Sequence, residues 1–287
     1  PVPPRGSAER RADPLAAPIS VQPAQGHRRA LAKRLPIALL GREPSNPGNP
    51  MSDTAAFAAD WPGAVLFDLD GTLIDSVGDI AAALNELIGR RGLGPLPVDA
   101  VKTMIGNGIA KLVERAYLSL EQPLSGEDLS REIEDLRAIY DTHLSGLTTL
   151  LPGAMETLRH LNANNVPCAV VTNKPIRAAR EVLDHFNLSG LLSAIVGDDG
   201  SITPKPAPDM LFKALDEIGI RREMAVMVGD SVADSRAGRA AGLPVVIVDG
   251  GYGTVPEGGI SADVTIPAMT ELVAALDSLR QKLARND

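Results

Sequence analysis

The chain has 287 residues, which is enough for one large domain or two of modest size. Its net charge of −8 and its aromatic content of 3% exclude the basic, aromatic-rich surface that nucleic-acid binding requires. No apolar run approaches the roughly 20 residues that cross a bilayer, so we expect neither a nucleic-acid nor a membrane partner. The single cysteine, Cys168, excludes an internal disulfide and favours a cytoplasmic location.

Residues 1–50 differ in composition from the rest of the chain. They contain 10 of the 23 prolines and carry a net charge of +5, which leaves −13 on the remainder. Proline-rich, basic sequence without an apolar period is typical of disorder, so we expect a disordered Pro- and Arg-rich tail over 1–58. The composition is also similar to that of a transit peptide. Because Met51 offers a start of its own, we expect residues 1–50 to be upstream sequence without a function.

The first expected element is a strand at residues 64–67, followed by a cluster of polar residues. The four residues form an unbroken apolar run, which is typical of a parallel strand buried on both faces. Asp68 and Asp70 follow it, with Gly71 and Thr72 behind them. Ligands of open parallel sheets bind outside the carboxyl ends of the strands, where two acids can share a divalent cation or act as nucleophile and proton carrier. A polar turn that caps a core strand would explain the two acids equally well.

A helical segment follows this strand. Ser76 and Asp79 have the spacing of a capping box, which predicts a helix start, and Gly92 predicts the helix end. No strand pattern is present from 77 to 147. Further helices are expected at about 98–104, 109–120 and 127–144.

This segment divides the chain into two expected domains. We expect an all-helical cap domain over 78–147, inserted into a core domain formed by 59–77 and 148–287. Linkers near 75–78 and 146–150 would join the two. A lid that two linkers connect to a sheet edge predicts opening and closing over a substrate.

From residue 151 the pattern alternates between strands and helices. Short apolar runs predict the strands, and amphipathic periods predict the helices between them. This alternation is typical of an α/β fold with a doubly wound, Rossmann-like parallel sheet. The expected strands are 167–172, 193–197, 224–229, 244–248 and 263–266, and the expected helices begin near 152 and cover 176–186, 208–219, 232–241 and 269–283.

Three further segments carry polar residues to the same expected sheet edge. Thr172 and Asn173 end one strand, although Thr172 is also a plausible helix N-cap. Lys205 lies among three prolines that would fix its direction, although a lone lysine in a loop is usually just solvated. Asp230 and Asp234 end another apolar strand, where a surface turn is the plain alternative. Together the segments supply carboxylates for a hard cation and donors for a phosphoryl group, which are the parts that phosphoryl transfer needs.

In order and content, these segments resemble the haloacid dehalogenase (HAD) superfamily of aspartate-based phosphatases. The resemblance covers about 62–285, and the position of the helical segment is similar to the C1-type cap of that superfamily. Gly106-Asn107-Gly108 with Val113-Glu114-Arg115-Ala116, Val171-Thr172-Asn173-Lys174-Pro175 and Gly197-Asp198-Asp199 resemble the group of bacterial phosphoglycolate phosphatases.

The resemblance implies a mechanism and a cofactor. Asp68 would attack phosphorus and become an aspartyl-phosphate, while Asp70 would protonate the leaving oxygen and then deprotonate the hydrolytic water. Mg²⁺ would be held by the Asp68 carboxylate, the Asp70 backbone carbonyl and Asp230. An acid at position 70 implies a phosphate ester as the substrate.

The same resemblance implies roles for the other polar residues. Thr172, Asn173 and Lys205 would bind the oxygens of the transferring phosphoryl group. Asp234 would orient Lys205 or a metal-bound water, and Thr72 would support the site.

The substrate is expected to be selected by the helical segment. Gly106, Asn107 and Gly108 would let the backbone approach a small anionic substrate, and Lys111 and Arg115 could meet its carboxylate unless both lie on a solvated helix face. The first expectation is 2-phosphoglycolate, which the enzyme would hydrolyse to glycolate and phosphate. The alternatives are a phosphosugar or N-acetylmuramate phosphate and, more remotely, a non-catalytic regulator that binds a phosphometabolite. We expect a monomer or a homodimer.

Overall fold

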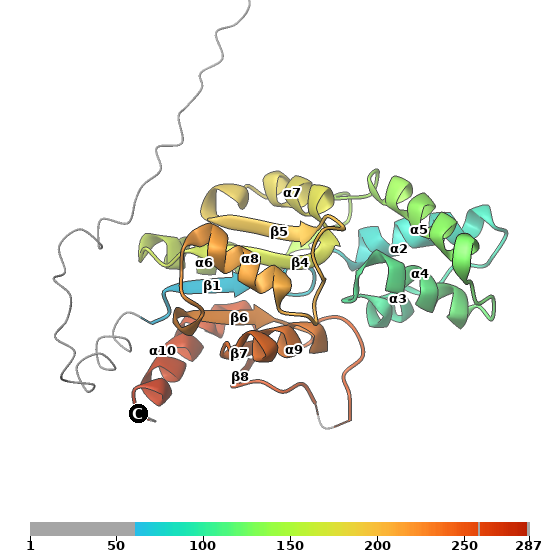
Figure 1. Cartoon of the computed structure of the whole chain (residues 1–287). Helices are drawn as coiled ribbons and strands as arrows, with labels where there is room; N and C mark the ends of the chain where they lie inside the picture. Colours follow the sequence, from blue (N-terminus) through green and yellow to red (C-terminus); the bar gives the residue numbers. More distant parts are fainter. Residues whose placement is uncertain (1–60, 258, 286–287) are drawn as a thin grey trace, which may run out of the picture. The chain divides into compact units, whose positions relative to one another are not determined.

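The computed structural model describes residues 61–257 and 259–285 (Figure 1). These residues all belong to one unit, Gly48–Asp287. The predicted tail over residues 1–58 lies outside the described residues. Within the part of the chain that is described, no helix has the length and apolar character needed to cross a bilayer.

A six-stranded parallel sheet confirms the predicted α/β fold. Its strand order is β5-β4-β1-β6-β7-β8, with every neighbouring pair parallel. All four residues of β1 are fully buried, as expected for a strand that is covered on both faces. The strands are β1 (Ala64–Phe67), β4 (Cys168–Pro175), β5 (Ala194–Asp198), β6 (Ala225–Gly229), β7 (Val245–Val248) and β8 (Val264–Ile266).

Helices cover the sheet on both faces (Figure 1). Because side chains alternate along a strand, Val65 and Phe67 of β1 belong to one hydrophobic cluster and Ala64 and Leu66 to the other. The first cluster contains side chains of α6 (Ala154–Ala163), α7 (Ile176–His185) and α10 (Leu272–Leu283). The second contains side chains of α8 (Asp209–Ile218) and α9 (Val232–Ala241).

The order of the strands places β1 at a switch point of the sheet. After β1 the chain adds β4 and β5 on one side, and it then crosses over to add β6 on the other. Phe67 consequently pairs with Val170 of β4 and with Val228 of β6. The carboxyl ends of these three strands therefore lie next to one another, which is where open α/β sheets bind ligands.

Four helices lie between the first strand and the rest of the sheet, as the sequence predicts. The most extensive contact among these helices is between α2 and α5, and Leu84 and Leu87 are among the buried residues of α2. α5 ends at Tyr140, a little before the expected position. These helices, which we call the helical insertion, are α2 (Val77–Arg90), α3 (Val98–Met104), α4 (Gly108–Ser119) and α5 (Gly126–Tyr140).

The two expected linkers are present, and they pair with each other, which the sequence did not predict. β2 (Ile74–Asp75) and β3 (Thr149–Leu150) form a two-stranded antiparallel sheet, with Ile74 opposite Leu150. The two passages between the sheet and the helical insertion therefore run side by side.

The predicted capping box at the start of α2 is wrong. Ser76 is the N-cap residue, but its side chain makes no capping hydrogen bond and instead donates to Asp70 Oδ1 at 2.5 Å. Asp79 accepts from the backbone N–H groups of Leu147 and Thr148. The segment that leads from the helices back to the sheet has backbone N–H groups that need a buried acceptor, and the Asp79 carboxylate is that acceptor.

Candidate active site

Asp68 follows β1 directly and is buried. Its backbone N–H continues the sheet by donating to the Val228 carbonyl, and its Oδ1 lies 2.8 Å from Lys205 Nζ. Burial and the negative charge of Asp234 raise the pKa of Asp68 to about 7, against the opposing effect of Lys205. This carboxyl group thus sits in a site that favours a nearby positive charge.

Asp230 lies between β6 and α9, next to Asp68. It accepts hydrogen bonds from Thr72 Oγ1 at 3.0 Å and from the Tyr252 backbone N–H at 2.6 Å. Burial, followed by the charges of Asp234 and Asp68, raises the pKa of Asp230 well above its ordinary value. Gly71, at φ +89°, lets the loop after β1 approach the Asp230 carboxylate, because a Cβ at this position would lie 2.4 Å from Asp230 Oδ2.

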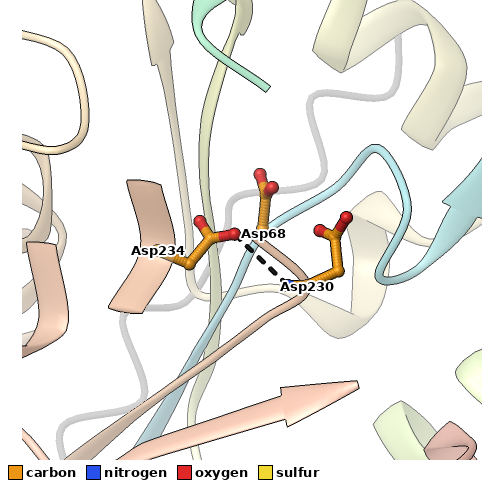
Figure 2. A group of neighbouring side chains, drawn as sticks. All are labelled: Asp68, Asp230 and Asp234. Atoms are coloured by element: carbon orange, nitrogen blue, oxygen red, sulfur yellow. Dashed lines mark hydrogen bonds between the residues drawn. The ribbon is translucent and has the colours of Figure 1, made fainter. Parts of the chain in front are cut away.

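Three carboxylates meet at this edge of the sheet. Figure 2 shows Asp68, Asp230 and Asp234 with their carboxylates close together, and one oxygen of each lies within 4.8 Å of the others. Lys205 is the one ammonium group bonded to this cluster in the described residues, so two negative charges stay unbalanced. Oxygen ligands with this excess charge fit a hard divalent cation.

Asp234 is the most constrained of the three acids. It forms a capping box at the start of α9, in which its Oδ2 accepts from the N–H and the Oγ of Ser231 and from the N–H of Asp230. Its Oδ1 accepts from Lys205 Nζ at 2.6 Å. Since its acceptor sites are largely used within the protein, Asp234 orients its neighbours, and Asp68 and Asp230 keep lone pairs for a metal ion.

Lys205 is buried and all three of its ammonium protons have acceptors. These are Asp68, Asp234 and, at 2.8 Å, the carbonyl oxygen of Val171. Burial acts to lower the pKa of Lys205, but the two carboxylates outweigh burial and hold it above its ordinary value. The lysine therefore stays charged and holds Asp68 in place.

Thr172 and Asn173 lie at the end of β4, beside Asp68. Thr172 Oγ1 accepts from the Lys174 N–H, and within the described residues its own hydroxyl proton has no acceptor. The Asn173 amide is engaged on every side: its Oδ1 accepts from the Lys205 N–H, and its Nδ2 donates to the carbonyls of Lys205 and Gly106. Asn173 thus fixes the lysine loop and the helical insertion relative to the sheet.

Asp70 forms an ion pair that the sequence analysis missed. Its Oδ1 lies 2.7 Å from Lys174 Nζ, and that ammonium group also donates to the Tyr140 hydroxyl at 2.5 Å. Burial acts to lower the pKa of Lys174, but Asp70 and Tyr140 outweigh it, so the pKa is above its ordinary value. One signal was available: Lys174 follows Thr172 at the two-residue spacing that puts side chains on one face of a strand.

Tyr252 is a second residue whose role the sequence did not reveal. Its N–H binds Asp230, while its hydroxyl accepts from the backbone N–H groups of Ser76 and Val77 and donates to Asp75. One residue, through its backbone N–H and its side chain, therefore connects the acidic cluster to the start of the helical insertion. The partners of its hydroxyl are 175 to 177 residues away in the chain, so no local pattern could predict these contacts.

A cavity opens between these polar residues and the helical insertion. Gly106 and Gly108 line it, as predicted, but Lys111 does not: it is exposed and pairs with Glu114. Arg115 donates to Asn107 Oδ1 and to the Met104 carbonyl. Arg115 and Asn107 therefore support the loop before α4 and do not line the cavity. The walls are mainly apolar and consist of Ile80, Ile105, Ile109, Leu112, Leu136 and Tyr140, and the floor consists of Asp68, Asp70, Thr172, Asn173, Lys174 and Pro175.

Comparisons with known proteins point to one family. Residues 65–248 match the haloacid dehalogenase-like hydrolase family. The phosphoglycolate phosphatase of Caulobacter vibrioides is 33% identical over 215 residues, which are 75% of this chain and 91% of that protein. The phosphoglycolate phosphatase of Pseudomonas fluorescens is 37% identical over 199 residues, 68% of this chain and 72% of that protein. The crystal structure of a predicted phosphoglycolate phosphatase from Haemophilus somnus has a TM-score of 0.69 and 28% identity, and covers 74% of this chain and 97% of that one.

The matched range contains each of the segments that meet at the sheet edge, from Asp68 to Asp234. It also contains the whole helical insertion, whose place after the first strand follows from the helical periods of the sequence. The resemblance is thereby confirmed at the level of the family. The chain belongs to the haloacid dehalogenase-like hydrolases.

Proposed function

We propose that the protein is a Mg²⁺-dependent phosphomonoesterase that acts through an aspartyl-phosphate on Asp68. The observation that carries the proposal is the position of Asp68 itself. It is buried at the carboxyl edge of the sheet, is held by Lys205 at 2.8 Å, and lies beside Asp230 in a cluster with unbalanced negative charge. A nucleophilic carboxylate needs this combination of fixed orientation and nearby positive charge.

The residues around Asp68 divide the work of the reaction. Lys205 holds Oδ1 of Asp68, which leaves Oδ2 to attack phosphorus as the bond to the leaving oxygen breaks. Asp70, two residues further on, would give the leaving oxygen its proton and later take one from the water that hydrolyses the aspartyl-phosphate. Asp68 and Asp230, with the Asp70 backbone carbonyl, would hold Mg²⁺, which neutralises charge between the nucleophile and the phosphate ester when bound.

We assign the phosphoryl contacts from the donors that are still available. The Thr172 hydroxyl can donate to a phosphoryl oxygen, because its proton has no acceptor among the described residues. Lys205 acts through its charge, since its donors are used within the protein. For Asn173 we propose a positioning role in place of direct binding by its amide, because that amide already holds the lysine loop.

Phosphoglycolate is the substrate that we propose, supported by the names of the relatives above. The cavity adds a physical argument against a phosphosugar or N-acetylmuramate phosphate. Apart from Tyr140, whose hydroxyl accepts from Lys174, its walls are isoleucine and leucine side chains, which would leave the hydroxyl groups of a sugar without hydrogen-bond partners. A non-catalytic regulator would not need Asp68, Asp70 and Asp230 together.

A panel of phosphate esters tests both levels of the proposal. Phosphoglycolate, two sugar phosphates and p-nitrophenyl phosphate are assayed with Mg²⁺, and kcat/KM is compared. We expect turnover of the aryl phosphate and a kcat/KM for phosphoglycolate at least tenfold above that for either sugar phosphate. A reversed order would refute phosphoglycolate alone, whereas no turnover of any ester would refute the phosphatase.

We also propose a cytoplasmic location, for which the single cysteine is the support. Cys168 is fully buried in β4, and burial raises the pKa of its thiol to about 12. It therefore offers neither an internal disulfide nor a reactive thiol, in keeping with a reducing compartment. A monomer or a homodimer remains our expectation for the oligomeric state.

A further inference from the structure

Lys174 stands apart from the other charged groups of the site because it faces the substrate cavity. Its side chain is 2% exposed, and it lines the cavity at the boundary between the polar floor and the apolar walls. Among the described residues that line the cavity, it is the one cation. The ammonium group reaches this place from the sheet and is also bonded to the helical insertion, through Tyr140.

The ammonium group of Lys174 has an unused donor. A lysine has three ammonium protons, and within the described residues only Asp70 and Tyr140 accept from Lys174. Lys205 provides the comparison, because its three protons all have acceptors in the protein. A buried cation with one free donor that lines a cavity is suited to bind an anionic or strongly accepting group of a ligand.

The surroundings of Lys174 strengthen such an interaction. The walls above it are apolar, so charges in the cavity are poorly screened and an ion pair formed there is stronger than one on the surface. Lys111, which the sequence analysis placed in this role, is exposed and paired with Glu114.

The chemistry of the proposed reaction fixes which part of the substrate meets Lys174. Asp70 is the residue expected to protonate the leaving oxygen, and Lys174 is bonded to Asp70 at 2.7 Å. In phosphoglycolate, the carbon that bears the leaving oxygen also bears the carboxylate. A group attached to that carbon is therefore next to the leaving oxygen and within reach of the same ammonium group.

We propose that Lys174 binds the substrate carboxylate and so selects phosphate esters that carry an anionic group on the carbon next to the ester oxygen. The proposal rests on the proposed phosphatase function and adds to it the residue that recognises the non-phosphate end. Tyr140 positions Lys174 from the insertion side, so recognition requires the helical insertion to lie over the sheet as it does here.

The test compares two substrates that differ in the carboxylate. Phosphoglycolate and ethyl phosphate share the ester and the phosphate, and ethyl phosphate has a methyl group where phosphoglycolate has the carboxylate. For Lys174→Met we expect the ratio of their kcat/KM values to fall roughly tenfold to a hundredfold, the usual range for a lost hydrogen bond to a charged group. The change should be carried mainly by a higher KM for phosphoglycolate, and Lys174→Arg should restore part of the ratio.

Two further variants keep the test decisive. Tyr140→Phe removes one contact of Lys174 while keeping its charge, and we expect a smaller fall of the ratio in the same direction; this variant serves if Lys174→Met does not fold, as judged by its thermal transition. Lys213→Met, a matched change at a surface lysine of α8 that pairs with Asp199, should leave both substrates unchanged.

The outcomes separate this proposal from the function on which it rests. If wild-type protein hydrolyses neither ester nor an aryl phosphate, the phosphatase function fails and the role of Lys174 with it. If wild-type protein is active but shows no preference for phosphoglycolate, the role of Lys174 alone is refuted. An equal loss of activity toward both substrates in Lys174→Met would show that the lysine only positions Asp70, and would also overturn the proposal.

Discussion

At the scale of single residues, the site is governed by buried carboxylates that repel one another. Asp68, Asp230 and Asp234 lie together, and burial, followed by the charge of Asp234, raises the pKa values of Asp68 and Asp230. An arrangement of this kind costs stability in the absence of a cation and is retained where chemistry needs it. Its consequences are measurable in both activity and stability.

Replacement of the nucleophile separates these two properties. Asp68→Asn keeps the size of the side chain and removes its charge and nucleophilicity, so we expect activity to fall by at least about a hundredfold, given the contribution of covalent catalysis. The metal-free variant should melt at the same temperature as wild type or higher, because one repelling charge is gone. Activity toward an aryl phosphate and a thermal melt in EDTA measure both. Activity above a hundredth of wild type would contradict the role of Asp68.

The raised pKa of Asp68 also predicts how pH affects the metal-free protein. The folded pKa of about 7 lies above the ordinary aspartate pKa of 3.8, so between these values the folded state binds more protons than the unfolded state. The contribution of Asp68 to stability is therefore complete below about pH 4 and is lost as the pH rises toward 7. In EDTA, the melting temperature of wild type should fall from pH 5 to pH 8 by more than that of Asp68→Asn. An equal fall in the melting temperatures of the two proteins would contradict the raised pKa of Asp68.

At the scale of elements, the first turn of helix α9 places Asp234 at the sheet edge. The capping box of Ser231 and Asp234 supports the helix, and the same Asp234 carboxylate holds Lys205. Local helix stability and the orientation of the site are therefore properties of one side chain.

Loss of the N-cap of α9 should lower both the stability of the protein and its catalytic rate. For Ser231→Ala we expect a loss of about 1 kcal/mol in the free energy of unfolding, typical of an N-cap, which corresponds to a fall of roughly 2–4 °C in melting temperature for a domain of this size. The value of kcat should fall as well, because Asp234 loses the Ser231 hydroxyl that fixes it. Ser278→Ala, a change at a surface hydroxyl inside α10, is the control. A Ser231→Ala enzyme with unchanged kcat would show that Asp234 needs no such support.

The elements differ in how far the sequence predicts them. Buried parallel strands such as β1 and β6 are unbroken apolar runs, and the amphipathic helices have clear periods, so these strands were predicted almost to the residue and the helices to within about four residues. β2 and β3 have two residues each, which is too short for any period, and their pairing depends on chain segments about 75 residues apart.

The site shows the same division. The residues that directly follow predicted strands meet at the sheet edge, because topology alone brings them together. Lys174 pairs with Asp70, 104 residues away, and the Tyr252 hydroxyl binds Ser76, 176 residues away, and periodicity along the chain predicts neither contact. Lys111 was misplaced because the face of α4 that meets the cavity is set by the packing of the helical insertion.

At the scale of the whole molecule, metal binding should appear as stability. The unbalanced charge of the acidic cluster would be relieved by Mg²⁺, and a ligand at a hundred times its Kd stabilises a fold by about 2.7 kcal/mol. We expect EDTA to abolish activity and lower the melting temperature, and Mg²⁺ to restore both. Asp230→Asn should lose most of the Mg²⁺-dependent rise in melting temperature. Full activity in EDTA would refute the metal requirement.

The pairing of β2 with β3 has a consequence for how such a protein can change its substrate. The helical insertion leaves the sheet at Asp75 and returns at Thr149, two residues that face each other across an antiparallel pair, where opposed Cα atoms are about 5 Å apart. Because its two ends are this close together, an inserted segment of any length can begin and end at this pair of strands without distorting the sheet. Exchange of the segment would then replace the apolar walls over the sheet and keep the acids beneath them, so that new specificity arises by grafting rather than by rebuilding the catalytic edge.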